Sequence, residues 1–287
     1  MSSDRLAVPE TVQGTRRPWP ASLLSGSAIT GLFILIAILS RVWTPQPPTH
    51  IRIALRLRGP LEAGLLGTDQ FGRDVISMLM AGTWNSLTTA FLSVLLGLVF
   101  GVAMGTAAAA LRGRLEEITM RSADLIFAFP ALITAIMITN ILGAGQAIAV
   151  TAIGIFIVPV FARVSRGAAL QIWARDYCLA ARAAGKSRTL ITIEHVIPNI
   201  AGTLLVQATL QLALAILIEA GLSFLGLGLP PPNPSWGRML NEAQTFLGSA
   251  PWLAIAPGAT IAMAVLGFNL LGDGLRDLFD PRLRAQR

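Results

Sequence analysis

The sequence contains little charge and almost no cysteine, and each shortage excludes a class of protein. Only 13% of the 287 residues are Asp, Glu, Lys or Arg, about half of the roughly 25% that soluble domains carry. The single cysteine, Cys178, cannot form an internal disulfide. One cysteine and two histidines, His50 and His195, are too few for the usual four-ligand zinc site. We therefore expect neither a water-soluble enzyme nor a domain held together by disulfides or a metal.

Apolar residues are abundant instead. They make up 54% of the chain, and the mean hydropathy is +0.66, which excludes a disordered protein. Several stretches without Asp, Glu, Lys or Arg are long enough for the helices of about 20 residues that cross a bilayer. We predict an all-α integral membrane protein with six transmembrane helices. They are expected at 21–43, 86–110, 125–141, 146–162, 203–227 and 252–272, and an interfacial segment at 75–84 precedes the second.

The distribution of basic residues predicts the orientation, because cytoplasmic loops carry an excess of Lys and Arg. With both termini in the cytoplasm, sixteen of the 22 basic residues fall on that side. The expected parts are a cytoplasmic tail at 1–20, the first helix, an extracytoplasmic loop with the interfacial segment at 44–85, a five-helix core at 86–272 and a cytoplasmic tail at 273–287. Interfacial tryptophans are then expected at the outer helix ends, at Trp43, Trp84, Trp236 and Trp252. This alternation also explains a pI near 11.2 without nucleic-acid binding.

The longest cytoplasmic loop, 163–202, is predicted to be structured. Residues 174–185 are rich in helix formers and end at Gly185, a natural C-terminal stop. Ser187 is placed to cap a second short helix that should end before Pro198. Four alanines (180, 181, 183 and 184) give the first helix a small face that another surface could approach. Two interpretations stay open, a solvated linker and a docking helix for a cytoplasmic partner.

No residues in this loop or elsewhere suggest catalysis by the chain. Gly185-Lys186-Ser187 resembles the end of a phosphate-binding loop, but Ala180 stands where that motif requires its first glycine. Glu194-His195 lacks the second histidine of a zinc-protease motif. We expect no catalytic residue, no metal and no cofactor in this chain, so any ATP would bind to another subunit.

Acidic residues near the predicted helices receive separate interpretations. Glu219 is the only carboxylate deep inside a predicted span, where a charge is costly, so it either faces a transport path or forms a structural hydrogen bond. Asp124 is expected to cap the start of the third helix. Asp273 and Asp277 are expected to lie at the capped end of the sixth. On the outer side, 66–77 predicts a turn before the interfacial helix, and the proline-rich 229–237 predicts a rigid connector or a docking surface.

Four strings resemble the permease subunits of bacterial ABC importers for peptides and nickel. That family carries a cytoplasmic motif of EAA, three residues, Gly, nine residues and I-x-L-P. Leu179-Ala180-Ala181, Gly185 and His195-Val196-Ile197-Pro198 fall at those spacings, with departures at Leu179, His195 and Ile197. The strings LGTDQFGRDVIS (66–77), EAGLSFLGLGLPPPNPSWG (219–237) and LGDGLRDLFDPR (271–282) are similar to further motifs of the dipeptide and oligopeptide branch.

The resemblance implies the type I ABC importer permease fold in a bacterial inner membrane. The implied partners are a second homologous permease, two cytoplasmic subunits that bind ATP and Mg²⁺, and an extracytoplasmic substrate-binding protein. The implied coupling loop contains Asp176, Leu179, Ala180, Ala181, Gly185, His195, Ile197 and Pro198. Cys178 lies among them and is expected to crosslink to the ATPase.

The implied cargo is a dipeptide or oligopeptide, with nickel or a metallophore as the alternative within the family. A stand-alone secondary transporter or channel is a rival, but it would not need a long structured loop, and no internal repeat is visible. A membrane protein of purely structural or assembly function is a further rival, and it would leave the four strings unexplained.

Overall fold

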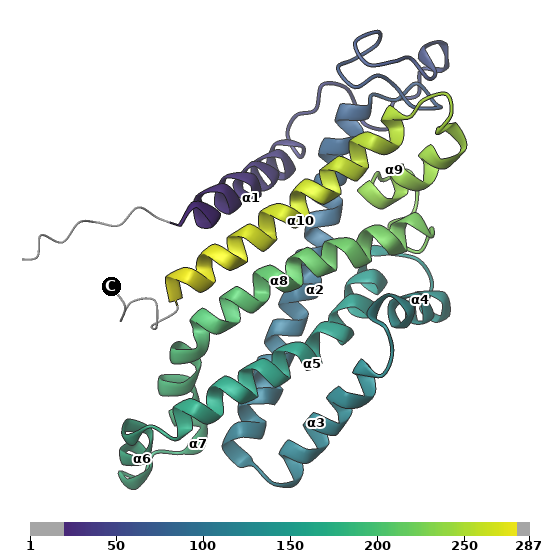
Figure 1. Ribbon diagram of the computed structural model, residues 1–287. Coiled ribbons are helices and arrows are strands. Elements are labelled where there is room, and N and C mark those ends of the chain that lie inside the picture. Colours follow the sequence, from purple (N-terminus) through teal and green to yellow (C-terminus); the bar gives the residue numbers. More distant parts are fainter. Residues whose placement is uncertain (1–19, 280–287) are drawn as a thin grey trace, which may run out of the picture.

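The computed structural model describes residues 20–279, and this part of the chain is built from helices (Figure 1). Residues 1–19 and 280–287, which hold most of the two predicted tails, lie outside the described range. Five described helices are long and apolar enough to cross a membrane: α1 (Ala21–Leu39), α2 (Val75–Leu111), α5 (Gln146–Trp173), α8 (Ile197–Phe224) and α10 (Trp252–Phe279). The prediction of an all-α membrane protein is therefore confirmed.

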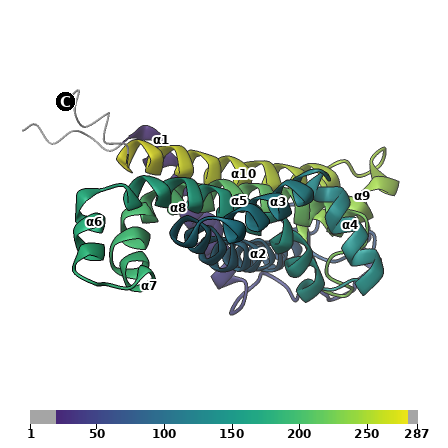
Figure 2. The same ribbon diagram turned by 90° about the horizontal axis from the view of Figure 1, so that it is seen from below.

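Shorter helices lie beside the bundle or at its two ends. They are α3 (Arg114–Phe127), α4 (Ala131–Leu142), α6 (Asp176–Ala183), α7 (Arg188–Ile191) and α9 (Trp236–Ala243). Of these, α3 runs along α5 (Figure 1). Figures 1 and 2 show the long helices side by side, with α6 and α7 at one end and α4 and α9 at the other. We call these the α6 end and the α9 end. The start of α1 and the end of α10 both point toward the α6 end (Figure 2).

The second predicted helix is longer than expected, because the interfacial segment at 75–84 is part of α2. The carboxylate of Asp74 caps this helix by accepting a hydrogen bond from the backbone N of Ser77 at 2.9 Å. No proline interrupts the 37 residues that follow. At 1.5 Å per residue α2 is roughly 55 Å long, so it extends well beyond the ~30 Å hydrocarbon core.

The prediction of one helix at 125–141 was wrong. The structure places α3 and α4 there, bent by 88° at a short break. Pro130 explains the break, since it has no N–H to donate and disfavours a helical conformation at Phe129. The expected six crossings correspond to the five long helices plus this bent pair, if the pair is counted as one span.

Three predicted helix boundaries were also wrong: the start after Asp124 and the ends at 162 and 272. In each case charged residues that were expected outside a helix lie inside one. α5 continues past Arg163 and Arg166 to Trp173 instead of ending at 162. Arg163 pairs with Asp124, and Arg166 Nε donates to Glu116 Oε1 at 2.7 Å. Asp124 therefore joins α3 to α5 and does not cap a helix start. Asp273 and Asp277 lie within α10, which continues beyond 272 to Phe279.

Glycines allow the close contact between α2 and α5. Gly97, Gly101 and Gly105 are four residues apart on α2 and all face α5. A Cβ atom at Gly101 would lie 2.5 Å from the carbonyl O of Val158. Small residues at this spacing let membrane helices approach closely. The stripe explains why α2 and α5 form the most extensive helix pair among the described residues.

One of the tryptophans expected at the membrane interface lies in the core instead. Trp236, expected at the membrane interface, is fully buried, and its ring contacts Phe33 of α1 edge to face at 5.8 Å. The proline-rich segment before it turns the chain back into the bundle, and the Ser235 side chain then caps α9. The expectation of an interfacial ring at this position was wrong because tertiary packing covers it.

Candidate functional site

The helix α6 lies at one extremity of the molecule, and most of its side chains are exposed (Figure 1). It ends in a Schellman motif, in which the backbone N of Lys186 donates to Ala181 O at 3.1 Å and that of Gly185 to Arg182 O at 3.0 Å. Gly185 has φ +87°, a conformation that glycine adopts without strain. The predicted glycine stop is confirmed.

The second short helix begins as expected but does not end as expected. The hydroxyl of Ser187 accepts a hydrogen bond from the backbone N of Leu190 at 3.3 Å and caps α7. A π-helical turn (Thr192–Val196) then leads directly into α8, with Pro198 in its first turn. The prediction of an end before Pro198, and of a separate helix starting at 203, was wrong. The π turn carries the helix past a residue that supplies no N–H, so one helical path runs from Arg188 to Phe224.

One buried side chain and two contacts attach α6 and α7 to the bundle. The buried side chain is that of Cys178, with 1% of its surface exposed. The ring of Tyr177 meets that of His195 edge to face at 6.0 Å. Arg188 Nη1 donates to the carbonyl O of Ala110, at the end of α2, at 2.9 Å. The Tyr177 ring therefore joins α6 to the π-helical turn before α8, and Arg188 joins α7 to the end of α2, so a displacement of this pair of short helices would reach both α8 and α2. Burial also means that Cys178 is not available for the expected crosslink.

The predicted coupling residues differ in exposure. Asp176, Leu179, Ala180, Gly185 and Pro198 are exposed, whereas Ala181, His195 and Ile197 are half-buried. Leu179 and Ile193 expose 53% and 58% of their surfaces. The same segment also exposes four basic residues, Arg175, Arg182, Lys186 and Arg188. Large apolar side chains among cations form a surface that suits a protein partner better than water.

Glu219 lies inside the helix packing at the other end of α8. It is 1% exposed, and its Oε1 accepts a hydrogen bond from the Ser223 hydroxyl at 2.7 Å. The hydroxyl of Ser86 on α2 also interacts with the carboxyl group. Ser86 in turn accepts a hydrogen bond from the backbone N of Trp236 at 3.4 Å. The carboxyl group of Glu219 therefore links α8 to α2 and to the start of α9.

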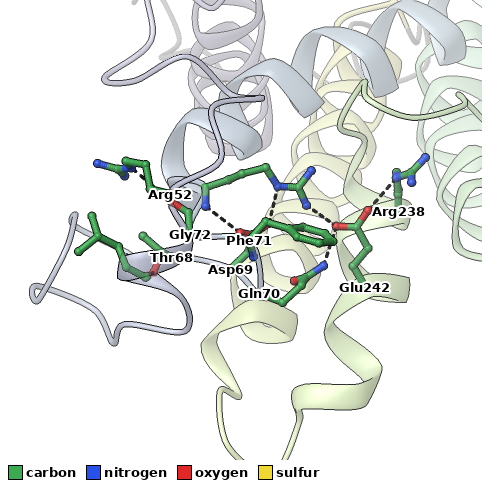
Figure 3. A network of polar contacts seen from close by, with 10 residues as sticks. Arg52, Thr68, Asp69, Gln70, Phe71, Gly72, Arg238 and Glu242 are labelled. Atoms are coloured by element: carbon green, nitrogen blue, oxygen red, sulfur yellow. Dashed lines mark hydrogen bonds and ion pairs between the residues drawn. The ribbon is translucent and has the colours of Figure 1, made fainter.

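A polar network at the α9 end joins two distant segments and was not predicted (Figure 3). Arg73 Nε lies 2.5 Å from Asp69 Oδ2, and Arg73 Nη2 lies 2.6 Å from Glu242 Oε2. Arg238 Nε approaches the other oxygen of Glu242 at 2.8 Å, and Gln70 donates to Glu242 at 3.2 Å. We call these five residues the clasp. The clasp fixes the loop before α2 onto α9.

Opposing effects act on the carboxyl group of Glu242. Burial opposes its ionisation, but the hydrogen bond from Arg238 and the charge and hydrogen bond of Arg73 outweigh burial, so the pKa of Glu242 lies below its ordinary value. The sequence did contain a signal for the clasp, since the charged residues of 66–77 and 229–251 are, apart from Asp74, those of the clasp. Nothing in the sequence indicated which carboxylate would pair with Arg73.

An open groove of about 390 Å³ lies between α8 and α10 toward the α6 end. Its lining includes the polar side chains of Thr203, Gln207, Asp273 and Arg276. A polar solute could lie against this face of the bundle. The described residues hold no cluster of three or more His, Cys, Asp or Glu side chains that could bind a metal ion.

Comparison with known proteins identifies relatives that match about nine-tenths of the chain. Residues 97–285 match the family described as "Binding-protein-dependent transport system inner membrane component". The glutathione transport system permease protein GsiD of Pectobacterium atrosepticum is 40% identical, over 89% of this chain and 86% of its own length. The dipeptide transport system permease protein DppC of Alkalihalophilus pseudofirmus is 39% identical, over 90% and 86%. A putative peptide permease protein of Brucella suis is 41% identical, over 91% and 88%.

A solved structure shares the fold. An inward-facing form of the MetNI methionine ABC transporter superposes with a TM-score of 0.59 and 18% sequence identity, over 73% of this chain and 96% of the matched chain. At this identity the likeness concerns the fold alone, and it confirms the expected type I ABC importer permease architecture.

Proposed function

This chain belongs to the family of binding-protein-dependent transport system inner membrane components, and from that membership we propose that it is the permease subunit of an ATP-driven peptide importer. The names of its relatives, a dipeptide and a glutathione permease, support a short peptide as cargo. Nickel or a metallophore is the alternative that an uptake assay must separate from peptides.

The α6 end is proposed to face the cytoplasm, with both chain termini on that side. The excess of basic residues in the loops at this end supports the assignment. The proposed partners are a second homologous permease, two cytoplasmic ATPase subunits that bind ATP and Mg²⁺, and an extracytoplasmic substrate-binding protein. This chain itself would make and break no covalent bond.

The single observation that carries the proposal is that α6 is both exposed and firmly attached. Its outer surface offers Leu179 and basic residues to a partner. Its inner surface buries Cys178 and places Tyr177 against His195. The next helix, α7, is attached to the end of α2 by the hydrogen bond from Arg188 to Ala110 O. A movement of the ATPase subunits would reach α8 through an unbroken helical path. At the far end the Glu219 hydrogen bonds would keep α2, α8 and the start of α9 moving together.

The proposal is tested by crosslinking in the assembled complex. Cys178→Ala removes the only thiol of this chain, and Leu179→Cys then places one on the exposed face of α6. A crosslink from position 179 to an ATPase subunit is expected. Arg121→Cys, on the exposed side of α3, is the matched control and should not crosslink.

The same preparation tests the cargo and the rival function. Vesicles containing the complex are expected to accumulate a labelled dipeptide or glutathione when ATP is supplied, and a labelled nickel chelate poorly. If the chain purifies without ATPase subunits and still transports by itself, it is a stand-alone carrier and the proposal fails.

A further inference from the structure

Leu61 lies in an unusual position in the loop between α1 and α2. Pro60 precedes it, its φ is +70°, and the backbone N of Glu62 donates to Gly59 O at 3.2 Å. These are features of a type II turn, whose third position normally holds Gly or Asn because an L side chain is strained there. Leu61 also exposes 81% of its surface. Both the backbone and the exposure argue against leucine at this site unless something binds it.

The turn is held rigidly. Within it, the backbone N of Leu61 donates to Gly64 O at 2.9 Å, and that of Gly59 to Glu62 Oε2 at 3.2 Å. Beside it, the backbone N of Thr68 donates to Arg58 O at 3.0 Å. The clasp in turn fixes this region to α9 (Figure 3). These hydrogen bonds hold the backbone of the turn, with Leu61 exposed at its apex.

Basic groups flank the apolar centre of this turn. Leu65 exposes 68% of its surface. Arg56 and Arg58 are exposed, and neither forms an ion pair within residues 20–279. Glu62 is the acidic residue of the turn, and its carboxylate accepts a hydrogen bond from the backbone N of Gly59; its one negative charge leaves the two arginines with a net positive charge. We call Arg56, Arg58, Leu61 and Leu65 the turn tip; it is an apolar centre with a positive rim.

We propose that the turn tip is a docking site for the substrate-binding protein, which would meet it with an acidic surface around an apolar pocket. The inference rests on the proposed function, since it assumes a binding-protein-dependent importer. Figure 1 shows the loop beyond the α9-end termini of α2 and α10, away from the level that the helices would span. Unpaired arginines favour an anionic protein surface and speed the encounter with it. A preformed turn lowers the ordering cost of binding.

The test uses the assembled complex in lipid nanodiscs and the purified binding protein encoded beside the permease gene. Leu61→Asn removes the apolar anchor and supplies a residue that the turn accepts. The dissociation constant of the binding protein is expected to rise about tenfold or more, while the melting temperature of the complex is unchanged or higher. The matched control is Leu247→Asn, at a leucine that is 52% exposed with an ordinary φ of −55°. It should leave the dissociation constant unchanged.

The other possible results separate failure of the proposed function from failure of the docking site alone. If the unaltered complex does not bind the binding protein, the proposed function fails together with the docking site. Unchanged binding by Leu61→Asn overturns the docking site alone. A fluorophore attached through Leu61→Cys in the Cys178→Ala background reports the remaining occupants. Quenching by spin-labelled lipid before any binding protein is added would assign the turn tip to the membrane. A crosslink from the same cysteine, left unlabelled, to the second permease would assign the turn tip to that interface.

Discussion

The guanidinium of Arg73 lies 2.6 Å from the carboxylate of Glu242, which follows it by 169 positions in the sequence. Asp69 holds the other side of Arg73, and Arg238 holds the other oxygen of Glu242. The side chains of Arg73 and Glu242 are only 11% and 18% exposed, so water screens the pair less than it screens a surface ion pair. This contact fixes the loop before α2 to the segment between α8 and α10.

Replacing Glu242 by glutamine is expected to lower the free energy of unfolding of the protein by about 1–3 kcal/mol, because Arg73 and Arg238 lose a buried charge partner. The measurement is thermal unfolding of the purified protein in detergent. Glu117→Gln is the control, since Glu117 pairs with Arg121 in an exposed position and should cost no more than about 0.5 kcal/mol.

The clasp also predicts a pH dependence. The pKa of Glu242 is lower in the folded protein than in the unfolded chain, where a glutamate has a pKa of about 4.3. Its contribution to stability is therefore fully present above that pH and is lost as the pH falls through the folded pKa. The melting temperature should fall less steeply below about pH 4.3 in Glu242→Gln than in the unaltered protein. Equal slopes would contradict the assignment.

Gly185→Val is expected to abolish ATP-coupled uptake while the protein still inserts into the membrane. A Cβ atom at this position meets no atom within 4 Å, so the penalty comes from φ +87° and amounts to about 1–2 kcal/mol of backbone strain. Gly185→Asn should retain much of the uptake, because asparagine tolerates this conformation. Gly167→Val is the control, since Gly167 also has open space but no positive φ. Normal uptake by Gly185→Val would reject the coupling role.

Glu219→Leu is expected to reduce the amount of folded protein, since it removes the hydrogen bonds that link α8 to α2 and costs about 1–3 kcal/mol. Glu219→Gln keeps an acceptor for Ser223 and should restore the protein level and the uptake. Melting temperatures of Glu219→Leu, Ser223→Ala and the double variant should be non-additive, because the two side chains share one hydrogen bond. Loss of uptake by Glu219→Gln at a normal protein level would instead assign the residue to the transport path.

Gly101→Ala is expected to lower the melting temperature, because the added methyl group would overlap the backbone of α5. Its Cβ would lie 2.5 Å from Val158 O, and moving the helices apart costs about 1–3 kcal/mol. Gly31→Ala on α1 is the matched control. A Cβ there meets nothing within 4 Å, so the change should be neutral or stabilise α1 by up to ~1 kcal/mol. A larger loss from Gly31→Ala than from Gly101→Ala would contradict the packing explanation.

Local signals predicted the local structures. The stop at Gly185 and the cap at Ser187 depend on residues within a few positions of one another, so they could be found in the sequence. The number of apolar stretches similarly gave the approximate number of spans. The helix ends were harder, because Arg163 and Arg166 are compatible with either a loop or a helix. Their carboxylate partners on α3 decide between the two.

The sequence by itself determined that this is a helical membrane protein with an exposed, capped element between two of its spanning helices. Hydrophobic length, charge bias and capping chemistry act within one segment at a time and can be recognised there. Only the tertiary structure decided that Cys178 faces inward, that Glu219 links three segments and that Arg73 pairs with Glu242. These relationships join residues that are far apart along the chain, and their partners are selected by how the helices pack.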